Sequence, residues 1–181
     1  MASHIASLIM EAMNAECCQN FAGPKHTLVD FHRMMTRLVE MEDSQYSYRN
    51  VLAAYTSSGI LAGICVAYDG AKLHQLRRRF YEAALEAFGI DYTGMTDETE
   101  DGEFYIDSLA VSSNFRGKGI ASQLLQATIE RGAELGIPTV GLLVDKGNPK
   151  AEALYQRLGF VYVNDSTWGG HQMRHLQYKH D

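Results

Sequence analysis

LAVSSNFRGKGIA, residues 109–121, predicts a strand, a short turn, a basic glycine-rich loop and then the first turn of a helix. Two glycines in the loop, Gly117 and Gly119, leave backbone N–H groups uncovered. The helix behind them adds its free N-terminal N–H groups and the positive end of its dipole. The stretch therefore predicts a binding site for a large ligand that carries phosphate.

The composition indicates one globular domain over residues 1–181, with an apolar content of 46% that suffices for a core. The formal net charge of −6 argues against general nucleic-acid binding, which depends on neutralising phosphates with Lys and Arg. No apolar run is long enough to span a bilayer, and no secretory signal is visible. Cys17, Cys18 and Cys65 lack metal-ligand spacing, so reduced thiols in a cytoplasmic protein are expected.

Apolar periodicity and turn residues predict alternating helices and strands. Thr27 and Asp30 resemble a capping box, Ser58-Gly59 predicts a hairpin turn, and Gly89 is a natural helix stop. The expected helices cover Ile5 to the break at Gly23-Pro24, 28–38, 73–88, 117–135 and Asn148 to Gly159, and the expected strands cover 50–57, 60–68, 103–111, 139–144, 160–163 and 173–178.

Three finer expectations concern a run of arginines, an acidic segment and one leucine. Arg77, Arg78 and Arg79 are expected to form a solvated helix face, with an anion site as the alternative. The acidic segment 91–101 is expected to be a mobile surface loop. Leu135 is expected to point inward from the helix over 117–135.

Two familiar phosphate-binding loops fit the opening stretch poorly. A nucleoside-triphosphate loop needs two glycines five positions apart, followed by Lys and then Ser or Thr, which this stretch does not supply. A dinucleotide fingerprint is matched loosely by Gly117, Gly119 and Ser122, but it should follow an early parallel strand. Here the motif follows a predicted hairpin and a long helix.

A third kind of loop fits better. Arg116-x-x-Gly119-x-Ala121, directly after Leu109-Ala110-Val111, closely resembles the acetyl-coenzyme A signature of the GNAT acyltransferase superfamily. The later segment NPKAEALYQRLGF, residues 148–160, is similar to the second signature of that family. The two motifs together span about residues 103–163, and the first half of the chain resembles the family only in its order of elements. The matching positions of the second motif are Asn148, Ala151, Tyr155, Gly159 and Phe160.

The resemblance implies acetyl-coenzyme A as co-substrate and no metal. The main-chain N–H groups of the loop would hold the pyrophosphate, and the pantetheine arm would pair with the preceding strand as an added strand does. Asn148 is expected to cap its helix and to touch the cofactor. The residues assigned to cofactor binding are Leu109, Ala110, Val111, Arg116, Gly117, Lys118, Gly119, Ile120, Ala121, Ser122, Asn148 and Tyr155.

The resemblance also places Tyr155 near the thioester sulfur as the general acid, and the alternative is a buried tyrosine behind the cleft. A phenol holds its proton at neutral pH and can share it with a strong anion. The resemblance does not identify the general base, because Leu142-Leu143-Val144 occupies the strand on which some relatives carry a Glu. Two residues are candidates for accepting a proton through water: Asp107, which shares strand parity with Leu109, and Glu103. The alternatives are that Asp107 is a structural hydrogen-bond acceptor and that the protein has no dedicated base.

The fold implied is a mixed α/β domain with a mostly antiparallel sheet. Parallel strands at 103–111 and 139–144 should splay apart to admit the cofactor. The family usually begins with a strand, but helical periodicity here starts at Ile5. We therefore expect no strand within residues 1–12, and a gap or a partner element at the edge of the hairpin strand from Asn50.

The activity implied is acetyl transfer to a primary amine by direct attack in a ternary complex, with no acyl-cysteine intermediate. The alternatives are a non-catalytic acyl-coenzyme A sensor and a nucleotide-binding protein. Acidic residues from Asp97 to Glu103 favour a cationic acceptor, although solvated loop charge explains them equally well. The helix over 73–88 is expected to shape an acceptor pocket or a homodimer contact. Trp168 and His171 line the acceptor pocket or a plain turn, and His171 and His175 are expected to be surface histidines rather than metal ligands.

Overall fold

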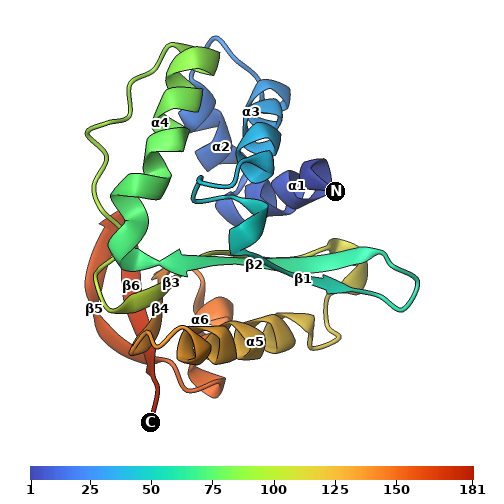
Figure 1. The fold of residues 1–181 in the computed structure, drawn as a ribbon, viewed down its shortest axis with the longest axis vertical. Coiled ribbons are helices and arrows are strands. Elements are labelled where there is room, and N and C mark those ends of the chain that lie inside the picture. The colour runs from blue at the N-terminus through green and yellow to red at the C-terminus, as the bar shows by residue number, and fades with distance from the viewer.

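In the computed structural model, which describes residues 1–181, one six-stranded mixed sheet has helices on both faces (Figure 1). The strand order is β1-β2-β3-β4-β6-β5, and only β3 and β4 run parallel. The expected mixed α/β fold is confirmed. The strands are β1 (Val51–Tyr55), β2 (Leu61–Asp69), β3 (Glu103–Val111), β4 (Thr139–Asp145), β5 (Val161–Trp168) and β6 (His171–Lys179). The helices are α1 (Ala2–Met13), α2 (Ala15–Ala22), α3 (Leu28–Glu40), α4 (Leu73–Phe88), α5 (Ile120–Glu134) and α6 (Pro149–Arg157), with short 3-10 segments at Tyr48–Asn50, Gly70–Lys72 and Ser113–Phe115.

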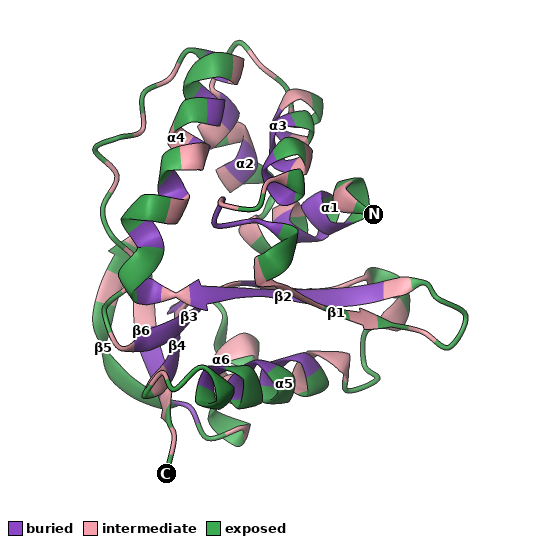
Figure 2. Ribbon diagram, viewed as in Figure 1, coloured by how far each residue is buried: buried purple, intermediate pink, exposed green.

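The sheet separates two apolar cores. Helices α1 to α4 cover one face, and α5 and α6 cover the other (Figure 1). Strand β2 supplies both cores by alternation: Ile64 and Val66 face the first four helices, whereas Cys65 and Ala67 face α5. It is therefore buried along almost its whole length (Figure 2). No helix combines the length and the apolar composition that a membrane crossing requires.

Local signals set most element boundaries as predicted. Thr27 and Asp30 form a complete capping box at the start of α3. Helix α4 ends at Gly89, whose φ of 70° is left-handed. Asn148 accepts a hydrogen bond from the Ala151 N–H and caps α6. The last two strands are longer than predicted.

The N-terminal region contains no strand, as predicted. Residues Ala2–Met13 are helical, and β1 lies at the sheet edge with only β2 as a partner. The expected single opening helix is interrupted at Asn14, the only non-glycine residue with a positive φ, and α2 begins after it. This break turns α2 back toward α3 and α4, where Phe21 packs edge-on against Phe80.

The parallel strands part as predicted. Residues 103–106 of β3 pair with residues 139–142 of β4, and the pairing stops there. On its other side β3 remains paired with β2 as far as Val111. The main chain of β3 beyond Ile106 is therefore open toward β4.

A β-bulge interrupts the β2–β3 pairing at the same level. Val66 pairs with Ser108 and Ala67 with Ile106, so Asp107 has no partner opposite it. The pleat parity expected between Asp107 and Leu109 is therefore wrong. Asp107 faces the side of α1 to α4, whereas Leu109 packs against the core on the α5 side.

Three side-chain expectations are also wrong. Arg77 is not solvated, because its side chain is 1% exposed and pairs with Glu98 of the acidic loop. That loop is anchored at this point, since Glu98 is itself buried. Leu135 follows the end of α5 and is 49% exposed, and His175 is buried beside Glu103 rather than at the surface.

Candidate functional site

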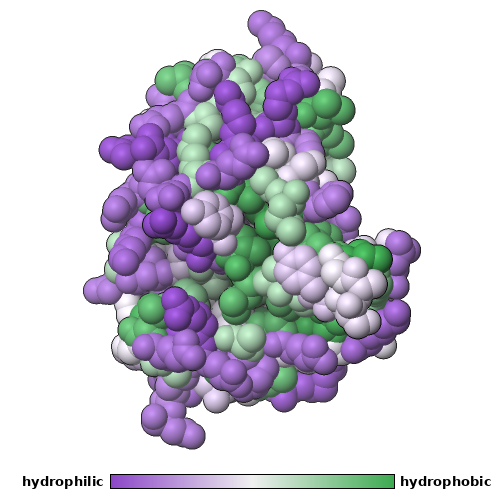
Figure 3. Space-filling view, turned by 45° about the vertical axis from the view of Figure 1, so that its right-hand side comes forward, coloured by the Kyte–Doolittle hydropathy of each residue, from purple (hydrophilic) through white to green (hydrophobic).

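A cavity of about 850 Å³ opens where β3 and β4 part. Its walls come from the end of α1, the start of α2, the splayed strands, the loop before α5, helix α6 and the β5–β6 turn. Viewed from one side, apolar side chains gather in a band between the layer of α1 to α4 and the β1–β2 hairpin (Figure 3). The residues that line the cavity run from Glu11 to Met173, so nearly the whole chain contributes to its wall.

The glycine-rich loop forms one end of this cavity. No N–H group from Arg116 to Ser122 donates a hydrogen bond within the protein. Gly117 and Gly119 have φ values of 74° and 77°, which side-chain-bearing residues adopt at a cost. A run of unpaired N–H groups ending at a helix N-terminus suits a pyrophosphate, so the residues present fit the cofactor that the sequence predicts.

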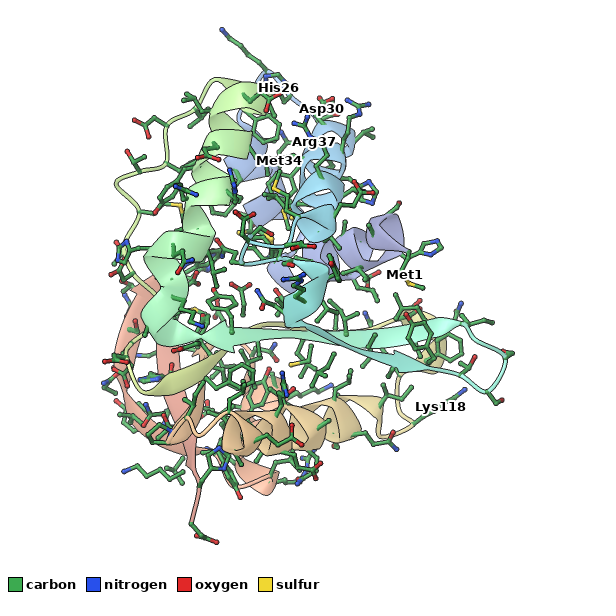
Figure 4. All side chains as sticks on the ribbon, in the orientation of Figure 1. Met1, His26, Asp30, Met34, Arg37 and Lys118 are labelled. Carbon is green, nitrogen blue, oxygen red and sulfur yellow. The ribbon has the colours of Figure 1, made fainter.

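The predicted cofactor residues divide into two groups. Lys118, Gly119, Ile120 and Ser122 do not line the cavity. Lys118 lies over the ring of Phe115, 5.4 Å from its centre, on the exposed loop before α5 (Figure 4). Those that line the cavity are Leu109, Ala110, Val111, Arg116, Gly117, Ala121, Asn148 and Tyr155.

Arg116 lines the cavity and makes two polar contacts, with Val111 and with Glu11. Its Nε donates a 3.0 Å hydrogen bond to the Val111 carbonyl, and its guanidinium lies 3.4 Å from Glu11 of α1. The side chain is 64% exposed, so the ion pair is weak. Arg116 therefore remains available to a phosphate.

Tyr155 reaches the cavity from α6. Its ring packs edge-on against Phe160, 6.0 Å between centres. Burial is the main cause that raises the pKa of Tyr155 above its ordinary value, and the nearby thiol of Cys65 raises it further. The phenol is therefore protonated at neutral pH, as a proton donor must be.

Asp107 faces the cavity from the bulge. Its Oδ2 accepts hydrogen bonds from Tyr68 at 2.7 Å and Gln45 at 3.2 Å, and its Oδ1 accepts one from Ser108 at 3.0 Å. Burial raises the pKa of Asp107, although these donors favour the charged form. Glu103, the other candidate base, does not reach this cavity.

A second carboxylate, Glu98, lines the same wall and was missed by sequence reasoning. Arg77 donates to it at 2.7 Å and Tyr105 at 3.2 Å. Burial, together with the charge of Asp107, raises the pKa of Glu98 to about 7. The acidic composition of its loop was a signal, but nothing local distinguished Glu98 from its neighbours.

Cys17 of α2 also lines the cavity, which the sequence did not indicate. Burial raises the pKa of its thiol to about 11, so it is a poor nucleophile at neutral pH. Trp168 and His171 both line the cavity at the β5–β6 turn, and Trp168 packs against Phe21.

Comparison with known proteins bears on the family and the fold. The model of the acetyltransferase (GNAT) family matches residues 34–160. GCN5-related N-acetyltransferase 4 of Arabidopsis thaliana is 26% identical over 174 residues, covering 87% of this chain and 60% of that protein. A probable spermine N(1)-acetyltransferase of Bacillus subtilis subsp. natto is 26% identical over 97 residues, covering 52% of this chain and 64% of that protein.

Among solved structures, a crystal structure of an acetyltransferase superposes with a TM-score of 0.81 at 26% identity, covering 98% of this chain and 94% of that one. An N-acetyltransferase from Staphylococcus aureus Mu50 gives a TM-score of 0.77 at 21% identity, with the same coverage, and shares the fold. A mycothiol acetyltransferase of Propionibacterium freudenreichii is 36% identical over 78 residues, 42% of this chain and 24% of that protein. The matches thus cover from about a quarter to under two thirds of these curated relatives.

Proposed function

Because the chain belongs to the acetyltransferase (GNAT) family, we propose that it transfers an acetyl group from acetyl-coenzyme A to a primary amine by direct attack in a ternary complex. The observation that carries the proposal is the run of unpaired N–H groups from Arg116 to Ser122. Part of this run, Arg116, Gly117 and Ala121, lines the cavity that also holds Tyr155 and Asp107. The co-substrate supplies an acetyl thioester.

The chain's own residues have separate roles in this proposal. The loop N–H groups bind the pyrophosphate, and the open main chain of β3 beyond Ile106 pairs with the pantetheine arm. Tyr155 holds the proton that the departing sulfur takes. Asp107 receives the proton of the attacking amine, directly or through water. The protonated thiol of Cys17 gives no support to an acyl-cysteine route.

We propose a cationic amine as the acceptor. Glu98, Asp107 and Asp145 line the cavity, and Tyr46 and Tyr105 stand beside the first two. Carboxylates and aromatic rings together attract an ammonium group. A homodimer through α4 and a cytoplasmic location stay predictions from the sequence.

Release of free thiol from acetyl-coenzyme A tests the activity, with a panel of a polyamine, an aminoglycoside, a lysine peptide and a neutral aromatic amine. The cationic amines should be preferred. Tyr155→Phe should lower kcat by about a hundredfold, whereas Tyr162→Phe, an exposed tyrosine on β5, should retain full turnover.

Two outcomes would contradict the proposal. Tight binding of acetyl-coenzyme A without thiol release on any amine would indicate a sensor. Thermal stabilisation by ATP or NAD, but not by coenzyme A, would indicate a nucleotide-binding protein.

A further inference from the structure

A second, smaller cavity of about 130 Å³ lies behind the wall of the first. Its lining is almost entirely polar, and it is bounded by the loop over 97–100, the start of β3 and the neighbouring strands β5 and β6. Glu98 and Leu143 line both cavities and separate them. Nothing in the proposed acetyl transfer uses the residues on its far side.

Three potential metal ligands meet in this second cavity. Glu100, Glu103 and His175 each offer one ligand atom, and these atoms all lie within 4.8 Å of one another. His175 Nε2 is 2.6 Å from Glu103 Oε2. Gln177 Nε2 donates to Glu100 Oε1 and to Glu103 Oε2, at 2.7 Å in each case. The cluster thus joins the loop to two strands that are far apart in the sequence.

The other charges around the cavity already have partners. Glu98 is paired with Arg77 at 2.7 Å, and Asp97 with His74 at 2.9 Å. Glu100 and Glu103 have no Lys or Arg beside them. The carboxylates of Glu100 and Glu103 therefore have the imidazole of His175 as their one basic neighbour.

Glu103 provides an independent sign of a missing partner. Its side chain is 1% exposed, and its Oε1 is buried without any hydrogen-bond partner. Leaving a buried carboxylate oxygen unpaired is costly, because the water that it loses is not replaced. Gly141 makes room for this carboxylate, since a Cβ at that position would overlap it.

We propose that Glu100, Glu103 and His175 bind a divalent transition-metal ion of the zinc type. Two carboxylates and one imidazole form a donor set that suits such an ion. The ion would replace the proton between His175 Nε2 and Glu103 Oε2, and its charge would neutralise both carboxylates. The ion would fasten the loop that carries Glu98 to β3 and β6. This inference does not depend on the proposed acetyl transfer, and it departs from the metal-free expectation drawn from the sequence.

Calorimetric titration with zinc chloride tests the site, using the full chain freed of any affinity tag and dialysed against chelator. Wild type should bind one ion per chain. Glu100→Gln should weaken binding by at least about tenfold, and it should fold normally because Glu100 is exposed. Asp101→Asn, an exposed acid next to Glu100 and outside the cluster, should bind as wild type does.

Thermal unfolding gives a second readout. Zinc should raise the Tm of wild type and of Asp101→Asn, but much less that of Glu100→Gln, because an ion bound only to the folded state stabilises it. Absence of zinc binding would overturn the proposal and leave His175 and Glu103 as a plain ion pair. Binding unchanged by Glu100→Gln would place the ion elsewhere and overturn it equally.

Discussion

Tyr68 donates a 2.7 Å hydrogen bond to Oδ2 of Asp107 at the point where the β2–β3 pairing is interrupted. The bulge leaves Asp107 without a partner opposite it and directs its carboxylate toward the cavity. The same level of β3 is where pairing with β4 ends. One irregularity therefore positions the candidate base and lies beside the opening for the cofactor.

Removal of the Tyr68 hydroxyl should move the pH dependence of acetyl transfer. Burial raises the pKa of Asp107, and hydrogen bonds from Tyr68, Ser108 and Gln45, together with the charge of Arg77, oppose part of this rise. Tyr68→Phe removes one of these donors, so the pKa should rise further. Because the base must be deprotonated, the loss of activity on the acid side should begin at higher pH.

Profiles of kcat/KM against pH for wild type and Tyr68→Phe measure this shift, with one amine acceptor throughout. Tyr55→Phe, on the exposed edge strand β1, is the matched control and should superpose on wild type. An acid limb that stays in place, or moves to lower pH, would show that Asp107 is not the base.

Local chemistry explains why much of the fold was predictable. The capping box at Thr27, the stop at Gly89 and the Asn148-Pro149 helix start each act within one helical turn. The glycine-rich loop is equally local, since glycine permits the positive φ values that Gly117 and Gly119 adopt.

Long-range pairing explains what the sequence did not reveal. Parity counting along β3 assumes a regular pleat, so it failed at Asp107. The partner of Arg77 lies 21 residues away in a loop, and Glu103 and His175 are 72 residues apart. Cys17 reaches the cavity only because the chain turns at Asn14. No local sequence pattern encodes contacts between residues so far apart in the chain.

Arg77→Met should destabilise the protein strongly. Both Arg77 and Glu98 have buried side chains, so the substitution leaves a buried carboxylate without its cation. The free energy of unfolding should fall by about 3 kcal/mol or more. Arg78→Met, at the adjacent and exposed position, should change it by less than about 0.5 kcal/mol. Urea denaturation measures both, and equal effects would contradict the burial of Arg77.

Gly141→Ala should also destabilise, by a different mechanism. The added methyl group would overlap the Glu103 carboxylate, which must then leave its hydrogen bonds to His175 and Gln177. Overpacking of this kind costs about 1–3 kcal/mol. Gly94→Ala is the control, because no atom lies within 4 Å of a Cβ there and its φ is not positive. A neutral Gly141→Ala would mean that Glu103 is not held over β4.

Asp30 should make stability depend on pH through the start of α3. Its carboxylate accepts hydrogen bonds from the Thr27 N–H at 2.9 Å and the Thr27 hydroxyl at 3.0 Å, and His26 lies beside it at the head of the helix (Figure 4). These bonds, the one from the Thr27 main chain first, lower the pKa of Asp30 below its ordinary value of 3.8. A lowered pKa in the folded state means that the carboxylate contributes stability above pH 3.8, and that this contribution is lost as the pH falls through the folded value.

Asp30→Asn should therefore lower the Tm at pH 7, and the difference from wild type should shrink as the pH falls below 3.8. Asp101→Asn, whose carboxylate is exposed, should show no such convergence. Thermal unfolding of the three proteins across this range measures the effect. A difference between Asp30→Asn and wild type that stays constant with pH would mean that the charge of Asp30 adds nothing at the helix N-terminus. Equal Tm values at every pH would mean that the amide oxygen accepts the Thr27 hydrogen bonds as well as the carboxylate does.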